Sequence, residues 1–209
     1  MLNLRVLRAP GLAAGLACMA LAMTAYGGFL FSLALHLQAG LGDSALRAGL
    51  TFAPAAAAFG LCGFYWRKLP QRIHHALTPA GFLVAAAAHL GLAADLRSGT
   101  QSGLQLQIVL LAFGAGLGLG YSPLVTNALV NVPLSEAADA SGLLTTTTQL
   151  SQVIGVATFG SLFLTLAAHA PPHASAHAIA ATMTWLAPLL AVGAVAGLSL
   201  ARTVVRARA

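Results

Sequence analysis

The chain has 209 residues, of which 58% are hydrophobic and only 7% are charged, whereas soluble domains carry about a quarter charged residues. This composition excludes an ordinary soluble domain. The formal net charge of +6 would suit a nucleic-acid partner, but the basic residues are separated by long uncharged stretches and form no single patch, so we expect a membrane protein with no nucleic-acid partner.

Long uncharged stretches locate the expected membrane helices, since a bilayer core needs roughly 20 mostly apolar residues per helix. Arg5 and Arg8 precede the first run, which continues too far for a cleavable signal peptide and is interpreted as the first span. The last stretch is too long for one helix and is broken by "HAPPHASAH" at 169–177, so it holds two spans. One domain over residues 1–209 is predicted, with helices at approximately 10–36, 48–66, 76–94, 104–131, 139–168 and 178–201.

The positive charges predict how the six spans are oriented. With a cytoplasmic N-terminus, eight Lys and Arg residues fall on the cytoplasmic side, and two, Arg47 and Arg97, fall outside. Inner loops of membrane proteins carry this excess of basic residues. We therefore expect a multi-pass membrane protein with both termini in the cytoplasm.

The fourth span, in "AFGAGLGLGYSP" (112–123), has a glycine at every second position. A dinucleotide-binding loop needs G-x-G-x-x-G after a strand, a spacing that this run does not provide. On a helix the glycines form two small-xxx-small pairs on nearly opposite faces, and such pairs let helices approach closely in lipid. We therefore expect the helix to pack between two neighbours through Gly114, Gly116, Gly118 and Gly120.

Two rows of uncharged polar residues follow, one on the fourth helix and one on the fifth. The first row continues the face of Gly116 and Gly120, and the second occupies a stripe of about 100° within "SGLLTTTTQLSQVIGVA" (141–157). Polar side chains in a span face a bundle interior or a water-filled cavity, although hydrogen bonding between helices would also explain any single residue. The predicted residues of a substrate cavity or bundle interface are Asn127, Asn131, Thr145, Gln149 and Gln152.

Two segments carry recognisable patterns. One is "LHLQAGLGDSALRAGLTFAPAA" (35–56), and the other covers residues 142–157, with the pattern G-x-x-x-T-x-x-Q-x-x-x-x-x-G-V-A. Both resemble signatures of the fourteen-helix drug:proton antiporters of the major facilitator superfamily, although His36 stands where that family usually has Tyr. The resemblance covers nearly the whole chain, but only the C-terminal six-helix half of the family.

The loop "GFYWRKLPQR" (63–72) resembles a degenerate copy of the family's G-x-x-x-D-R-x-G-R-K motif. The matching residues are Gly63, Lys68 and Arg72, while Arg67 replaces the acid and Pro70 replaces the glycine. The gating role of this loop in the family therefore does not carry over directly.

The resemblance implies an all-α membrane protein whose six helices form one bundle of two inverted three-helix repeats. In that fold the first and fourth helices line the cavity, the second and fifth face the other bundle, and the third and sixth face lipid. The implied function is one half of a proton-coupled transporter of the bacterial inner membrane that exports drugs or other amphipathic small molecules by alternating access. An N-terminal bundle or a second copy would complete it, and neither enzymatic activity nor a cofactor is expected.

Alternative interpretations stay open at this stage. One is a truncated remnant that folds but transports nothing. Another is an intramembrane serine protease of the rhomboid type, but Pro123 follows Ser122 and no histidine lies in the middle of the last span. The histidines of "HAPPHASAH" have metal-ligand spacing, but two prolines break that segment, so an outside loop and no metal are favoured.

The four acids all fall in predicted loops, so no buried carboxylate is available to carry a proton. His89, in the third span, is one candidate for a residue that carries a proton. An interior histidine with satisfied hydrogen bonds is the preferred interpretation of this residue.

Overall fold

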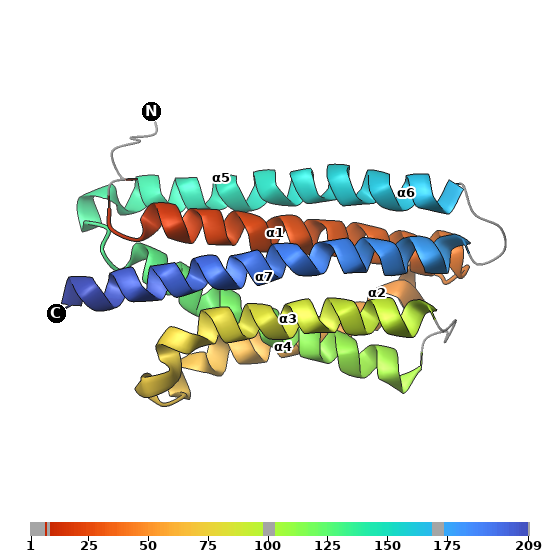
Figure 1. Ribbon diagram of the computed structural model, residues 1–209, viewed down its shortest axis with the longest axis horizontal. Helices are drawn as coiled ribbons and strands as arrows, with labels where there is room; N and C mark the ends of the chain where they lie inside the picture. The colour runs from red at the N-terminus through yellow and green to blue at the C-terminus, as the bar shows by residue number, and fades with distance from the viewer. Residues whose placement is uncertain (1–6, 8, 98–102, 169–173, 209) are drawn as a thin grey trace.

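Six apolar helices, each long enough to span a membrane, make up the computed structural model (Figure 1). The structure describes residues 7, 9–97, 103–168 and 174–208, with side chains up to residue 198. No strand occurs among these residues, in agreement with the predicted all-α fold. The helices are α1 (Leu12–Leu35), α2 (Ala45–Tyr65), α3 (His74–Arg97), α4 (Leu104–Leu129), α5 (Ala137–Gly155), α6 (Ser161–Ala168) and α7 (Ala174–Arg208).

Short turns extend or connect these helices. α1 continues into a π-helical turn, η2 (His36–Gly40), and the 3-10 turns η3 (Trp66–Lys68) and η4 (Gln71–Ile73) join α2 to α3. A second π-helical turn, η6 (Val156–Gly160), joins α5 to α6. The fifth span therefore runs without interruption through α5, η6 and α6.

Helix boundaries differ from the prediction mainly in α3 and α7. The sequence predicts that the third helix ends at residue 94, but α3 continues three residues further and holds Asp95 in its last turn instead of a loop. Leu96 is buried as well, so the apolar face of α3 extends past the acid. α7 begins at Ala174 rather than 178 and ends at Arg208 rather than 201, because the residues that extend it at both ends are rich in alanine and arginine, which favour a helix. Pro188 lies inside α7 without ending it, as prolines can in membrane helices.

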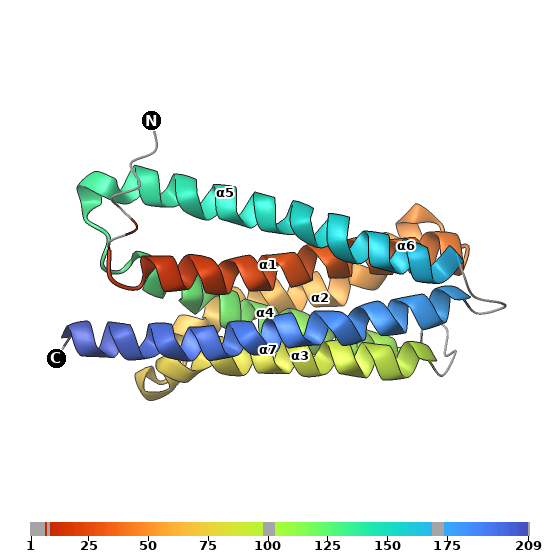
Figure 2. The same ribbon diagram turned by 45° about the horizontal axis from the view of Figure 1, so that its top comes forward.

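The two sets of three spans exchange packing partners. α2 packs mainly on α4, whereas α5 packs on α1. α3 packs on α4 and α7, and α7 packs on α1. α5 and α6 lie along one side of α1, and α2, α3 and α4 lie on the other (Figures 1 and 2). Such an exchange is the arrangement expected of two inverted three-helix repeats.

Glycines bring the backbone of α4 close to both of its neighbours. Gly114 and Gly118 face α2, where a Cβ on Gly118 would lie 2.5 Å from a backbone carbonyl oxygen. Gly116 and Gly120 face α3, where a Cβ on Gly116 would lie 2.7 Å from a backbone amide nitrogen. α4 therefore lies between two helices, and the atoms nearest to Gly116 and Gly118 on those helices are backbone atoms.

The contact between α1 and α5 is built in the same way. A Cβ on Gly155 would lie 2.9 Å from the amide nitrogen of Gly28. Beside this crossing, the hydroxyl of Ser32 donates to the carbonyl oxygen of Phe159 in η6 at 3.4 Å. α6 then packs on α7, so the fifth span changes its packing partner at the π-helical turn.

Two of the six spans are covered much less than the others. Only 22% of the apolar segment of α2 and 22% of that of the fifth span are buried, against 50–61% for the other four. Large apolar side chains such as Phe64 on α2 and Val153 on α5 are exposed. The uncovered faces of α2 and α5 are therefore open to lipid or to another protein.

We predict that Gly116→Ala lowers the melting temperature of the detergent-solubilised protein. The added methyl group would meet backbone atoms of α3, which cannot move aside as a flexible side chain can, and overpacking of this kind costs about 1–3 kcal/mol. Gly60→Ala is the matched control, because no atom lies within 4 Å of the Cβ position there. Equal melting temperatures for the two variants would show that close packing at Gly116 is unimportant.

Candidate functional site

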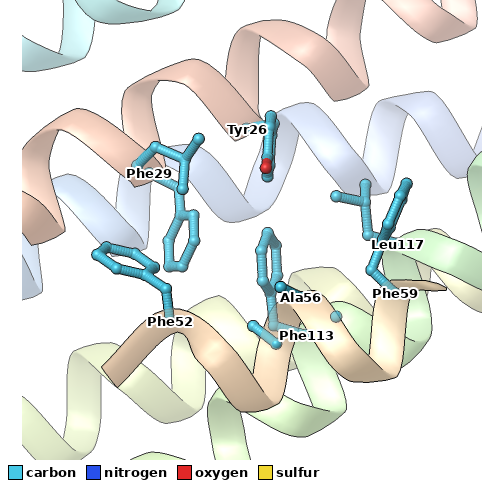
Figure 3. A pocket seen from close by; sticks show the side chains of 10 residues that line it. Tyr26, Phe29, Phe52, Ala56, Phe59, Phe113 and Leu117 are labelled. Atoms are coloured by element: carbon cyan, nitrogen blue, oxygen red, sulfur yellow. The ribbon is translucent and has the colours of Figure 1, made fainter. Parts of the chain in front are cut away.

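An aromatic cavity lies between α1, α2 and α4 (Figure 3). It encloses about 140 Å³ and is lined almost entirely by apolar side chains. Each helix contributes residues that share one face, at spacings of three, four or seven positions. The aromatic lining residues are Tyr26 and Phe29 on α1, Phe52 and Phe59 on α2, and Phe113 on α4.

The rings in the cavity wall contact one another. The ring of Phe29 lies 4.3 Å from that of Phe113 and 5.9 Å from that of Phe52, the latter in an edge-to-face arrangement. Gly114 also lines the cavity. An apolar cavity of ~150 Å³ is known to hold benzene. The cavity is therefore large enough for one aromatic ring of a ligand.

His89 of α3 lies beside this wall. Its ring is 4.9 Å from Phe113 and 5.5 Å from Phe29, and its side chain is fully buried. Nδ1 donates to the carbonyl oxygen of Ala85 at 2.9 Å, which leaves Nε2 as the acceptor nitrogen of a neutral ring. No described residue is bonded to Nε2, so the expectation of a fully satisfied histidine is wrong.

The cavity is not predicted from the sequence. One available signal was the seven-residue spacing of Phe52 and Phe59, which places both rings on one face of α2. Spacing within single helices cannot tell which faces of three helices meet. The cavity became visible only when α1, α2 and α4 were placed together.

The two predicted asparagines lie near the end of α4. Asn131 donates from Nδ2 to the carbonyl oxygen of Pro10 at 3.0 Å, which ties this end of α4 to the start of α1. Asn127 is half-buried one helical repeat earlier. Asn131 thus has a packing contact in addition to any functional role.

The three predicted residues of α5 lie in different environments. Thr145 and Gln149 are exposed, and the hydroxyl of Thr145 donates to the carbonyl oxygen of Ser141 at 3.0 Å. Gln152 is half-buried and donates from Nε2 to the Met23 sulfur of α1 at 3.8 Å. Gln149 is therefore the residue of this row that most clearly faces away from the bundle.

The structure does not bring the two polar rows together within this chain. α4 and α5 lie on different sides of α1 and pack on α1 rather than on each other. The aromatic cavity contains none of the five predicted residues. A shared cavity would need surface from outside this chain.

Other histidines that the sequence singles out lie near the ends of the spans. The imidazole Nδ1 of His36, which is buried, lies 2.6 Å from the hydroxyl of Ser175 and so links the ends of α1 and α7. Of the histidines in "HAPPHASAH", His169 and His173 lie outside the described residues, and His177 is exposed. The described residues contain no group of three potential metal ligands.

The degenerate loop motif lies at the end of α2. Gly63 faces α4, where a Cβ would lie 2.8 Å from the hydroxyl oxygen of Ser122. The guanidinium of Arg67 stacks over Trp66 at 5.5 Å, while Arg72 is exposed further along the loop. The pocket around Ser122 includes no histidine that could serve as a base for a serine nucleophile.

Comparison with known proteins identifies one matching family. The sequence model of the Major Facilitator Superfamily matches residues 1–156. The chain is 34% identical over 170 residues to a probable actinorhodin transporter of Streptomyces coelicolor, and 31% identical over 139 residues to the multidrug efflux pump LfrA of Mycolicibacterium smegmatis. These alignments cover 79% and 65% of this chain but only 29% and 27% of the relatives, so the chain spans less than a third of their length.

We predict that Ala56→Phe abolishes binding of a single-ring aromatic probe such as toluene. Ala56 lines the cavity, so the added ring would occupy the space that the probe needs. A ligand that binds only the folded state raises the melting temperature, and this rise is the quantity to measure. Ala57→Phe is the control, because this neighbouring residue is also exposed on α2 but does not line the cavity. An equal rise in both variants would exclude the cavity as the binding site.

Proposed function

Because the chain belongs to the major facilitator superfamily, we propose that it is the C-terminal six-helix half of a fourteen-helix drug:proton antiporter. It would export amphipathic small molecules from a bacterial cell by alternating access, together with an N-terminal bundle. The names of the two relatives, an actinorhodin transporter and a multidrug efflux pump, support this class of cargo. The matched segment is less than a third of each relative, which leaves length for further helices in those proteins.

The aromatic cavity is the observation that carries the proposal. Binding sites for small molecules are mostly apolar and aromatic, with a few polar groups that orient the ligand. The cavity lies between α1, α2 and α4, and its volume of about 140 Å³ suits one ring of a larger cargo. The rest of the cargo would lie against the partner bundle.

The uncovered faces of α2 and α5 support a partner bundle. On α2, Gly49 and Gly60 have no atom within 4 Å of their Cβ positions, so another helix could approach closely there. α5 exposes Thr145 and Gln149, whose uncharged polar groups can orient a cargo without burial of a charge. In the proposed complex, these residues would lie at the junction of the bundles, and Asn127, Asn131 and Gln152 would complete its polar lining.

Proton coupling needs a group that can gain and lose a proton. Of the histidines in the described spans, His89 is the one whose ring contacts rings of the aromatic cavity. Its Nε2 has no partner among the described residues. We propose His89 as the contribution of this half to coupling, with further groups in the partner bundle.

The chain alone is expected to confer no drug efflux, because one bundle makes only half of a cavity. Fused to the N-terminal bundle of a related pump, it should lower the accumulation of ethidium in cells. In this fusion, Gln149→Leu should slow efflux by about fivefold, the effect of losing one hydrogen bond worth about 1 kcal/mol. The measurement is ethidium efflux at matched protein abundance.

Gln71→Leu is the control for this experiment, since it removes an exposed glutamine in the loop between α2 and α3. Its efflux should equal that of the unmodified fusion. Efflux that is unchanged in Gln149→Leu would remove the support for a role of α5 in cargo binding. A fusion that reaches the membrane but never transports would instead favour a non-transporting remnant.

Both ends of the bundle can be located by thiol labelling, and we propose that the termini are cytoplasmic. In a Cys62→Ala background, a membrane-impermeant maleimide added to intact cells should label His177→Cys and spare Arg72→Cys. Both positions are exposed, and they lie at opposite ends of the spans. The remaining thiol, Cys18, is buried. Labelling of Arg72→Cys alone would reverse the proposed orientation.

A further inference from the structure

A second pocket, apart from the aromatic cavity, lies where α2 ends. It is formed by the last turn of α2, the turn η3 and the C-terminal third of α4, and its volume is about 640 Å³. The segment that joins α2 to α3, which includes η3, lies toward the end of the bundle where α1 begins and α7 ends (Figure 1). Its polar lining residues are Arg67, Lys68, Tyr121, Ser122 and Thr126.

The charged groups of this pocket are all positive. Arg67 and Lys68 both line it, and none of the four acids of the chain does. Both cations rest on aromatic rings, Arg67 at 5.5 Å from the ring of Trp66 and Lys68 at 4.4 Å from the ring of Tyr65. Cation–π contacts of this kind position the charges but do not neutralise them. The pocket therefore attracts an anion.

The hydroxyl groups of the pocket suit an anion with several acceptor oxygens. The hydroxyl of Thr126 donates to the carbonyl oxygen of Ser122 at 3.1 Å, so its proton is already used. The described residues make no hydrogen bond to the hydroxyls of Tyr121 and Ser122, which are therefore available as donors. Two cations and two hydroxyl donors form a set that matches a phosphate group.

An apolar pocket adjoins the basic one. It encloses about 340 Å³ and is lined by Leu61, Tyr65, Leu69 and Leu119, together with Cys62 and Trp66. Trp66 lines both pockets, so the indole ring separates a basic compartment from an apolar one. Tryptophan is enriched in membrane proteins where the headgroups of the bilayer meet its acyl chains, so the type of residue at position 66 suits a lipid.

We propose that the two pockets bind one anionic phospholipid, with its phosphodiester between Arg67, Lys68 and the two hydroxyls and an acyl chain beside Trp66. Free inorganic phosphate presents the same phosphate oxygens as the lipid headgroup, so the basic pocket alone would not distinguish the two ligands. The adjoining apolar pocket favours the lipid, because free phosphate would leave that pocket unused. This site is distinct from the proposed transport cavity, and its test does not depend on transport.

Trp66 provides a local probe for the test. The chain has two tryptophans, so Trp185→Phe leaves Trp66 as the only one. The full chain in this background is placed in phosphatidylcholine vesicles that contain a small fraction of phosphatidylglycerol with brominated acyl chains, which quench nearby indole fluorescence. Brominated phosphatidylglycerol should quench Trp66 more strongly than an equal fraction of brominated phosphatidylcholine.

Matched variants distinguish a specific lipid-binding site from general attraction to an anionic surface. Arg67→Ala should weaken the preference for phosphatidylglycerol by about tenfold or more, the effect of losing a hydrogen bond to a charged group worth about 1.5 kcal/mol. Arg72→Ala removes the same charge from an exposed position in the same loop that does not line the pocket, so it should lose only the general surface attraction of one basic group, at most about fivefold. Ser122→Ala, which leaves the charge unchanged, should weaken the preference, whereas Ser141→Ala on α5 should not.

Three results would overturn the proposal. If Arg67→Ala and Arg72→Ala weakened the preference for phosphatidylglycerol equally and Ser122→Ala left it unchanged, the preference would come from general electrostatic attraction to the surface. Equal quenching by the two brominated lipids would exclude a preference for the anionic headgroup. If millimolar inorganic phosphate protected Trp66 from quenching and the protein showed no preference for phosphatidylglycerol, the basic pocket would be a site for free phosphate. A melting temperature that matches the parent protein, measured for each variant, excludes misfolding as the cause of a loss.

Discussion

The fold depends on close backbone contact at three helix crossings, between α2 and α4, α3 and α4, and α1 and α5. Lipid tails are as apolar as leucine, so burial of apolar side chains drives helices together only weakly inside a bilayer. At these crossings glycines such as Gly116, Gly118 and Gly155 let backbone atoms approach within a distance that a Cβ would forbid. The crossings join helices from different repeats, and this leaves α2 and α5 uncovered on their outer sides.

Much of the fold follows from the sequence, because it depends on local patterns. Uncharged stretches predict the six spans, and the spacing of Gly114 to Gly120 predicts two opposite faces on α4. The boundary of α3 could not be predicted, since an acid such as Asp95 normally marks the end of a span. Its burial depends on neighbours that the local sequence does not specify.

The candidate site is less predictable than the fold because it depends on the relative positions of several helices. The polar rows of α4 and α5 follow from periodicity, but α1 lies between them, and no pattern within one helix reveals this. The threonines illustrate a second difficulty. Thr145, Thr148 and Thr158 each donate to the carbonyl oxygen four residues earlier, so a stripe of hydroxyls need not face a cavity. Gln149 cannot satisfy its amide in this way, which makes it the more informative residue.

The π-helical turn η6 has a consequence for how insertions and deletions would act on this chain. A π-helical turn accommodates roughly one residue more than the corresponding α-helical turn, and each residue turns an α-helix by about 100°. Loss of one residue between Val156 and Gly160 would therefore restore an ordinary α-helix without rotating the buried ring of Phe163 away from the core. The same deletion in α5 would rotate Phe163 by about 100° relative to α1. Evolutionary changes in length are thus tolerated at one point of the fifth span and costly elsewhere along it.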